Sequence, residues 1–280
     1  MSMPFYVPPE QVMKDRADFA RKGIARGRSV IVLGYDKGIA FVAENPSRAL
    51  HKVSEIYDRI AFGAVGRYNE FESLRVAGIR YADLRGYSYD RTDVTARALA
   101  NTYAQTLGAV FTQESKPFEI EIVVAEVGLT PDGDQIFRLT YDGSVADEQG
   151  FVVMGGASEK AEERLSTTWR PGLALGETLR LAVDVLAAGD NGERREIGAA
   201  QLEVAVLDRD RPRRTFRRIV GPLLTRLLSS EDPTADAPLV DEKHPGHPEV
   251  LSGESTEGGG GDSGTGHEDA ASDPHPHPPG

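Results

Sequence analysis

The sequence predicts an α+β protein, in which two antiparallel sheets stack between two layers of helices as a four-layer αββα sandwich. Neighbouring strand patterns are joined by tight turns, which favours antiparallel pairing. The helix patterns come in consecutive pairs, so the helices should cover the outer faces of the sheets. The first strand patterns are apolar nearly throughout, as expected when both faces of a sheet are covered.

An extra amphipathic helix is expected before the first strand. Pro8, Pro9 and Glu10 form a helix start, because proline presets the first turn and an acid suits its positive end. Apolar residues at helical spacing then form one stripe: Met13, Ala17, Ala20 and Ile24. This stripe needs a partner, either in its own domain or in a neighbouring protein.

The first half of the sandwich follows directly. A hairpin is predicted over 29–35 and 39–43, and two further strands over 53–57 and 60–65. Two long helices come next, and each has an apolar face: Phe71, Leu74, Gly78, Tyr81 and Leu84 on the first, and Leu99, Tyr103, Thr106, Leu107 and Val110 on the second.

The second half repeats the order of strands followed by helices. Three strands are predicted over 119–127, 136–141 and 151–154. One helix should open with Ser158 as its N-cap. The remaining elements are a helix with the stripe Leu175, Leu179, Ala182, Val183 and Leu186, strands over 201–207 and 215–219, and a final helix over 220–228.

Charge divides the chain into a nearly neutral body and an acidic tail. Residues 230–280 carry twelve acids and one lysine, a net charge of −11, which leaves −1 of the total −12 for residues 1–229. The tail also has five of the six histidines, a Gly258–261 run and many prolines. Such a composition buries too little apolar surface to offset the entropy of ordering, so 230–280 is expected to be disordered.

Several classes of protein find no support in the sequence. Cysteine is absent, which rules out a disulfide framework and thiol chemistry. No dense metal-ligand spacing, phosphate-binding loop or dinucleotide fingerprint is present, so no metal or cofactor is expected. No apolar run is long enough for a membrane span and the N-terminus lacks the order of a signal peptide, which favours a cytoplasmic protein without a membrane partner.

Residues 44–59 raise the main functional question. Lys52 stands there as a lone cation at the start of a strand, where it could tune a catalytic base, receive a carboxylate or lie on a plain surface. His51 is the only histidine of the body and fits a half-buried or surface position better than a catalytic triad. Gly155 and Gly156 could cradle an anion before a helix, although tight backbone packing explains them better.

Six arginines cluster near the end of the body: Arg209, Arg211, Arg213, Arg214, Arg217 and Arg218. A nucleic-acid surface is one interpretation, but Phe216 alone supplies the aromatic component and Asp208 and Asp210 dilute the charge. A solvated strand edge or a contact between subunits is the preferred interpretation, so no nucleic-acid partner is expected.

Nine segments together resemble the alpha subunits of the proteasome core particle, most closely the bacterial (actinobacterial) type. They span nearly all of residues 1–229: 20–26, 41–48, 52–59, 68–71, 85–91, 103–108, 141–144, 151–156 and 211–214. The resemblance implies the N-terminal-nucleophile hydrolase fold with an extra N-terminal helix. It also implies a barrel with two outer rings of seven alpha subunits and two inner rings of seven beta subunits.

Proteolysis in such a barrel belongs to the beta subunits, whose N-terminal threonine is the nucleophile. Here Arg28 or Ser29 occupies that position inside the chain, and an internal serine lacks the free α-amino group that serves as base. Glu44 and Lys52 fall where the family's acid and lysine would lie. The chain is therefore expected to have no catalytic residues, as a structural and regulatory subunit of a threonine-type endopeptidase complex.

The resemblance gives Lys52 another role. The matching lysine in relatives lies between adjacent alpha subunits and receives the C-terminal carboxylate of an activator, here expected to be a ring-shaped ATPase that delivers unfolded proteins tagged with the small modifier Pup. Arg26 and Gly27 would flank this pocket. Residues 1–9 would be a gating segment before a domain over 10–229, and its gate residues would be Met3, Pro4, Phe5, Tyr6, Val7, Pro8 and Pro9.

Two other functions stay open at this point. The chain could be a self-processing N-terminal-nucleophile hydrolase that cleaves itself before Ser29. It could also bind nucleic acid through the arginine cluster, in which case binding would depend strongly on salt.

Overall fold

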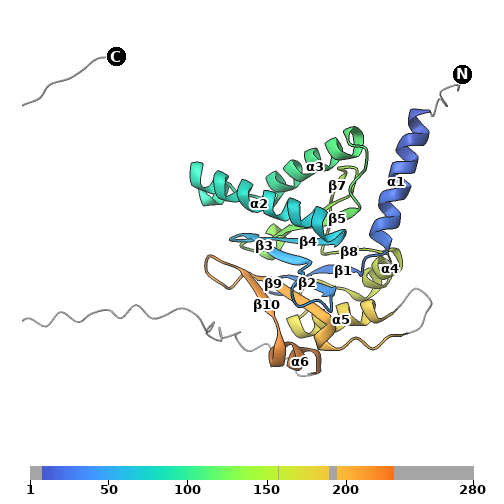
Figure 1. The fold of residues 1–280 in the computed structure, drawn as a ribbon. Helices are drawn as coiled ribbons and strands as arrows, with labels where there is room; N and C mark the ends of the chain where they lie inside the picture. Colours follow the sequence, from blue (N-terminus) through green and yellow to red (C-terminus); the bar gives the residue numbers. More distant parts are fainter. Residues whose placement is uncertain (1–7, 157, 189–193, 230–280) are drawn as a thin grey trace, which may run out of the picture. The chain divides into compact units, whose positions relative to one another are not determined.

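Two five-stranded sheets lie face to face, with helices outside them, in the part of the chain that the structure describes (Figure 1). This computed structural model describes residues 8–156, 158–188 and 194–229. The expected gate residues Met3, Pro4, Phe5, Tyr6 and Val7 and the expected tail 230–280 lie outside the described residues.

Every strand pair of the two sheets is antiparallel, as the tight turns predict. The first sheet has the order β10 (Phe216–Ile219), β9 (Leu202–Asp208), β2 (Gly38–Glu44), β1 (Val30–Tyr35) and β8 (Phe151–Met154). The second sheet has the order β3 (Val53–Tyr57), β4 (Ile60–Gly66), β5 (Ile120–Glu126), β6 (Gln135–Leu139) and β7 (Val145–Asp147).

A tight turn joins β1 to β2. Tyr35 is paired with Gly38, so Asp36 and Lys37 alone form the connection. Gly38 has a φ of +153°, and a Cβ atom there would lie 1.9 Å from the carbonyl oxygen of Leu207 on β9. Glycine is therefore required at this position by close backbone approach as well as by the turn.

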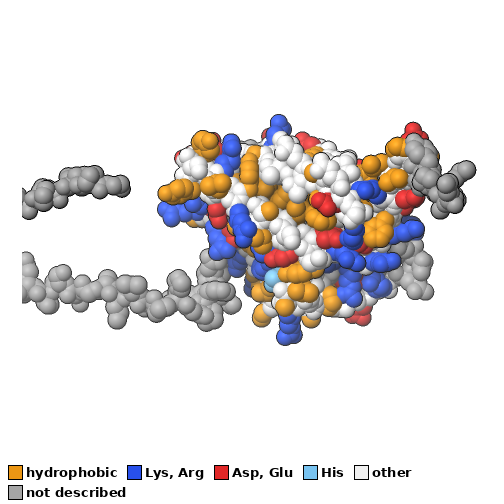
Figure 2. Space-filling model, turned by 45° about the horizontal axis from the view of Figure 1, so that its top comes forward, with side chains coloured by type: hydrophobic (Ala, Val, Ile, Leu, Met, Phe, Trp, Pro, Cys, Tyr) orange, Lys and Arg blue, Asp and Glu red, His pale blue; other side chains and the backbone are white. Residues whose placement is uncertain are grey.

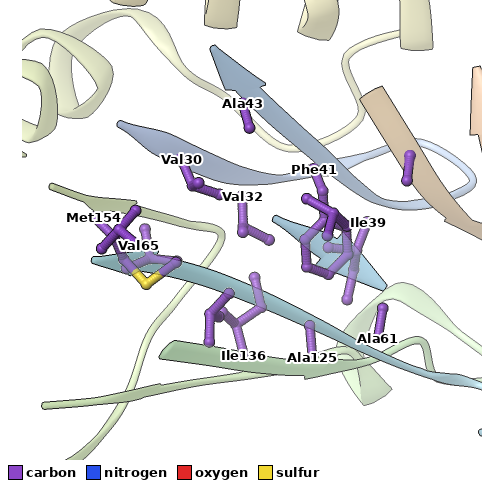
Figure 3. Packing of buried hydrophobic residues seen from close by; sticks show 14 of the residues in the cluster. Val30, Val32, Ile39, Phe41, Ala43, Ala61, Val65, Ala125, Ile136 and Met154 are labelled. Atoms are coloured by element: carbon purple, nitrogen blue, oxygen red, sulfur yellow. The ribbon is translucent and has the colours of Figure 1, made fainter. Parts of the chain in front are cut away.

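The inner core lies between the two sheets (Figure 3). Val30, Val32 and Phe41 of the first sheet face residues such as Ala125 and Ile136 of the second. Phe41 is fully buried, and burying such a side chain stabilises the fold by roughly 1.5–3 kcal/mol. Since β1 and β2 are buried on both faces, their uninterrupted apolar sequences are explained.

Helices cover the two outer faces (Figure 1). Helices α2 (Tyr68–Ser88) and α3 (Ala96–Gln113) pack on the second sheet, where the rings of Phe62 and Tyr103 meet edge to face at 5.9 Å. Helices α4 (Ser158–Thr168), α5 (Leu175–Ala187) and α6 (Gly221–Ser229) form the layer on the first sheet. The predicted four-layer αββα sandwich is confirmed.

Helix α1 (Pro9–Ala25) is the extra helix before the first strand, and it begins at the predicted prolines. Its C-terminal half is anchored in the domain, because Ala20 and Ile24 join the core between the sheets. Arg16 donates to the carbonyl oxygens of Phe111 and Glu114, both at 2.7 Å, at the end of α3. Met13 remains 38% exposed, so the apolar stripe is only partly buried within this chain.

Some boundaries differ from those predicted. The short strand β7 was not expected, because its three residues are exposed and polar in part and show no alternation. Ser158 is the first residue of α4, so its prediction as N-cap is wrong. Strand β6 ends at Leu139 instead of Tyr141, since Thr140 to Ser144 form a turn in which the amide of Gly143 donates to the carbonyl of Thr140.

Three short 3-10 helices complete the described elements: η1 (Arg91–Asp93), η2 (Pro131–Gly133) and η3 (Ala199–Gln201). Within the described ranges, no helix combines the length and the apolar character needed to cross a membrane. On the face drawn in Figure 2, acidic and basic side chains are interspersed with hydrophobic ones, which agrees with the nearly balanced charge of residues 1–229.

Candidate functional site

Lys52 lies at the end of the loop that connects the two sheets, directly before β3. Its side chain is half-buried, and its ammonium group Nζ donates to the carbonyl oxygen of Arg28 at 2.6 Å. Arg28 belongs to the short link between α1 and β1. The fold thus brings Lys52 to the point where the extra helix joins the sandwich, 24 residues away in sequence.

The surroundings of Lys52 lower the pKa of its ammonium group. Burial, with the nearby charge of Arg28, lowers the pKa of Lys52 to about 8, although the carboxylates of Glu203 and Glu44 act in the opposite direction. Removing an ammonium from water disfavours its charged form. Lys52 is therefore still charged at neutral pH but loses its proton far more readily than a surface lysine.

Hydrogen bonds fix the loop that carries Lys52. The amide of Asn45 donates through Nδ2 to the carbonyl of Leu50 at 2.7 Å, and its Oδ1 accepts from the backbone of Ser47 at 3.0 Å. The Ser47 hydroxyl accepts in turn from the backbone of Leu50 at 3.0 Å. These bonds define a compact loop, so the backbone of Lys52 has a fixed position.

Arg26 and Gly27 stand at the C-terminal end of α1. Arg26 is the exposed C-cap residue, and the backbone N–H of Gly27 donates to the carbonyl of Ile24 at 2.8 Å. A Cβ atom on Gly27 would lie 3.2 Å from the backbone nitrogen of Gly66 on β4, which explains a small residue there. Arg26 and Gly27 directly precede Arg28 in sequence, and Arg28 is the residue whose carbonyl oxygen accepts the hydrogen bond from Lys52.

Glu44 has different partners from those suggested by its position. Its carboxylate is buried and lies 3.5 Å from Nε of Arg28 and 3.1 Å from Nη2 of Arg195. Two guanidinium groups therefore balance this charge, while Lys52 affects it only through the longer-range field. The sequence could not indicate Arg195 as a partner, because 151 residues separate it from Glu44.

Ser29 is held inside the polypeptide between α1 and β1. Its backbone carbonyl accepts from the amide of Glu44 at 3.4 Å, as a continuation of the β1–β2 ladder. Gly155 adopts a φ of +113°, and a Cβ atom there would lie 3.0 Å from Cα of Ser29. A Cβ atom on Gly156 would lie only 2.5 Å from the carbonyl oxygen of Ala25 at the end of α1, so the two glycines serve tight backbone packing.

Of the expected gate residues, the structure describes only Pro8 and Pro9. Pro8 is the N-cap of α1, and its carbonyl oxygen accepts from the backbone of Gln11 and Val12 at 3.0 and 3.2 Å. Pro9 is the first helical residue, where its missing N–H costs no hydrogen bond.

A polar cleft of about 400 Å³ is lined by His51, the residue before Lys52, together with Ser54, Tyr68, Arg75, Arg214 and Arg218, while Lys52 itself is not part of its wall. Each arginine of this wall is paired within the chain: Arg75 with Glu72 at 2.5 Å, Arg214 with Glu55, and Arg218 with Glu203 at 2.8 Å. His51 is exposed, as predicted, and its Nδ1 lies 3.2 Å from Glu203. The cleft is charged but internally balanced.

The arginine cluster proves to be largely a structural feature. Arg209 is only 11% exposed and forms an ion pair with Asp134 at 2.7 Å, which ties the β9–β10 hairpin to η2. Arg211 donates to the carbonyl of Phe216 at 3.1 Å and so closes the hairpin itself. A solvated edge is therefore the wrong interpretation for Arg209, which is partly buried against Asp134, a carboxylate that sequence alone could not reveal as its partner. The alternative of a contact between subunits stays a prediction.

Among the described residues, no group of three or more histidine and acidic side chains is arranged to hold a metal ion. His275 and His277 of the tail could bind a metal weakly by their spacing, although a solvated low-complexity segment is the preferred interpretation, and both lie outside the described residues.

Comparisons with known proteins agree with this fold. The family model described as "Proteasome subunit" matches residues 24–207. Because this range covers more than half of the chain, the chain belongs to the proteasome subunit family.

The relatives of this chain show which type of proteasome subunit it is. "Proteasome subunit alpha" of Sanguibacter keddieii is 72% identical over 231 residues, 82% of this chain and 91% of the relative. The protein of the same name from Xylanimonas cellulosilytica is 71% identical, with 80% and 95% of the two chains covered, and that of Kineococcus radiotolerans is 67% identical, with 82% and 99% covered. The chain is an alpha subunit of the actinobacterial type, as its resemblance predicted.

Proposed function

We propose that this alpha subunit forms the outer seven-membered rings of a proteasome core, stacks on rings of beta subunits, and has no catalytic residue of its own. Two features support the absence of catalysis. Ser29 lies between Arg28 and Val30 within a continuous chain, so it has no free α-amino group to act as base. The carboxylate of Glu44, which lies where the family's acid would lie, forms ion pairs with Arg28 and Arg195, so this acid is already engaged in structural contacts.

Substituting Ser29 by alanine tests this part of the proposal. Particles that contain Ser29→Ala are expected to hydrolyse peptides at the wild-type rate, because the nucleophile belongs to the beta subunit. Intact mass spectrometry should also find the chain uncleaved before Ser29. A fragment that starts at Ser29, or a loss of hydrolysis in particles that assemble normally, would support a self-processing hydrolase instead.

Activator docking is the second part of the proposal. We infer that Lys52 receives the C-terminal carboxylate of a ring-shaped ATPase, with Arg26 and Gly27 beside it. The observation that carries this inference is the fixed, half-buried ammonium group at the end of α1. An ammonium has three donors, and the bond to Arg28 uses one of them, which leaves donor capacity for a carboxylate.

Weak docking at each subunit is sufficient in a ring. A charge-assisted bond contributes roughly 1.5–3 kcal/mol, and several tails that bind the same ring gain from effective concentration. The ATPase would deliver unfolded, Pup-tagged proteins through a pore that residues 1–9 gate. We expect the particle to be cytoplasmic. We also expect the domain to span 10–229 and the acidic tail to follow it over 230–280.

Docking is expected to weaken as the pH rises above about 8. Burial lowers the pKa of Lys52 to about 8 in the unoccupied site, and a bound carboxylate would raise it again by stabilising the ammonium. Affinity should therefore be constant below pH 8 and then fall by up to about tenfold per pH unit, until the pKa of the occupied site is reached. Titrating a labelled tail peptide into assembled particles from pH 6.5 to 9.5 measures this dependence, and constant affinity across that range would contradict it.

A further inference from the structure

Glu203 of β9 occupies the centre of a hydrogen-bond network around the Lys52 loop. Its carboxylate is buried and accepts from the backbone amides of Lys52 at 2.8 Å and Val53 at 3.2 Å. Nδ2 of Asn45 and Nη1 of Arg218 also donate to it, both at 2.8 Å. Both carboxylate oxygens are therefore used to hold the segment that leads into β3.

The charge of Glu203 is maintained by these donors. Burial alone would raise the pKa of Glu203, but hydrogen bonds from Asn45, Lys52, Arg218 and Val53 outweigh it and hold the pKa below its ordinary value. A buried carboxylate that accepts several hydrogen bonds stays ionised at neutral pH. A fixed negative charge is thus present beneath the backbone of Lys52.

The backbone of Lys52 is held on both sides. Its N–H donates to Glu203 on the first sheet, and its carbonyl accepts from the amide of Ala64 on the second sheet at 3.0 Å. Arg218 extends the connection, because its Nη2 donates to the carbonyl of Val53 at 2.7 Å. Glu203 therefore couples the position of the docking lysine to β9, in the interior of the first sheet.

We propose that Glu203 is the positioning residue of the docking site, which presets the Lys52 loop and supplies a negative charge that favours the ammonium form of Lys52. This inference rests on the docking role proposed for Lys52. Glu203 does not contact the incoming carboxylate; it acts through the backbone and the charge state of Lys52.

Glu203→Gln tests the proposal with the smallest change in shape. Glutamine removes the charge and presents an NH₂ group to the two N–H donors that now face one of the carboxylate oxygens, so two hydrogen bonds are lost. A fluorescein-labelled peptide with the C-terminal sequence of the ring ATPase is the probe, and the same peptide with an amidated C-terminus gives the baseline. Assembled particles that carry Glu203→Gln should bind the free-acid peptide roughly tenfold more weakly at pH 7.

A pH profile separates positioning from a purely structural effect. Loss of the negative charge should lower the pH at which binding begins to fall, from about 8 in the wild type to a lower value. Glu203→Asp, which keeps the charge on a shorter side chain, should retain the wild-type pH midpoint even if its affinity is reduced. Glu203→Asp also provides the answer if Glu203→Gln fails to assemble.

Glu55→Gln is the matched control. Glu55 lies on β3 and on the wall of the neighbouring polar cleft, where it pairs with Arg214, so Glu55→Gln removes one negative charge close by without removing a hydrogen bond of the Lys52 loop. Wild-type affinity and pH midpoint in Glu203→Gln, or a lowered midpoint in Glu203→Asp, would overturn the role of Glu203. Unchanged binding in Lys52→Ala would instead reject the docking function itself, so the two failures are distinguishable.

Discussion

Replacing Lys52 by alanine is expected to abolish stimulation of peptide hydrolysis by the ring ATPase, while the particle still assembles. The substitution removes the ammonium group from every subunit of the ring. Each site loses roughly 1.5–3 kcal/mol of charge-assisted bonding, and this loss multiplies over the tails that bind one ring. Within the chain, the side chain of Lys52 gives up its bond to the carbonyl of Arg28, so the fold should tolerate alanine.

Hydrolysis of a fluorogenic peptide with and without the ATPase measures this effect, and native electrophoresis reports assembly. Lys37→Ala is a suitable control, because Lys37 is an exposed lysine whose ion pair with Asp210 at 3.4 Å lies in a different part of the domain. Lys37→Ala should be stimulated normally. Full stimulation of Lys52→Ala particles would remove Lys52 from the docking role.

Deleting residues 2–8 is expected to raise the basal hydrolysis of peptides by the assembled particle several-fold. Phe5, Tyr6 and Val7 are apolar enough to cluster where the N-termini of a ring meet, and such a cluster would block the pore. Helix α1 starts at Pro9 and is anchored by Ala20 and Ile24, so the deletion leaves the supports of the helix in place.

The rate of peptide hydrolysis without ATPase tests this deletion, and it is compared between deleted and wild-type particles at equal concentration. A second sample with an inactivated beta-subunit threonine should show no hydrolysis, which confirms that the added activity comes from the proteolytic chamber. An unchanged basal rate in the deletion would reject the gate.

The layers of the fold could be predicted because their information is local. The apolar residues of β1 and β2 lie next to one another in sequence, and the two-residue turn between them is evident from Asp36, Lys37 and Gly38. Helices α2 and α3 have repeating apolar faces that their own sequences reveal, although Leu84 and Thr106, both predicted to lie on these faces, are exposed. Strand β7 has no such repetition and depends on pairing with β6, so it was missed.

The candidate site was predictable only in part. Lys52 was found through a sequence resemblance, but its contact with Arg28 depends on residues that only the folded chain brings together. Glu203 left no recognisable pattern, because its donors are 15 to 158 residues away and include backbone amides. A solvated edge was one prediction for Arg209, because its side chain is charged. Arg209 is partly buried instead, and its partner Asp134 could not be inferred from the sequence.

Electron microscopy of the chain co-expressed with its beta subunit tests the central claim most directly. We expect stacked rings with seven-fold symmetry, in which this chain occupies the two outer rings and α1 lies at the ends of the particle. A particle without seven-fold rings, or an isolated chain that has cleaved itself before Ser29, would contradict it.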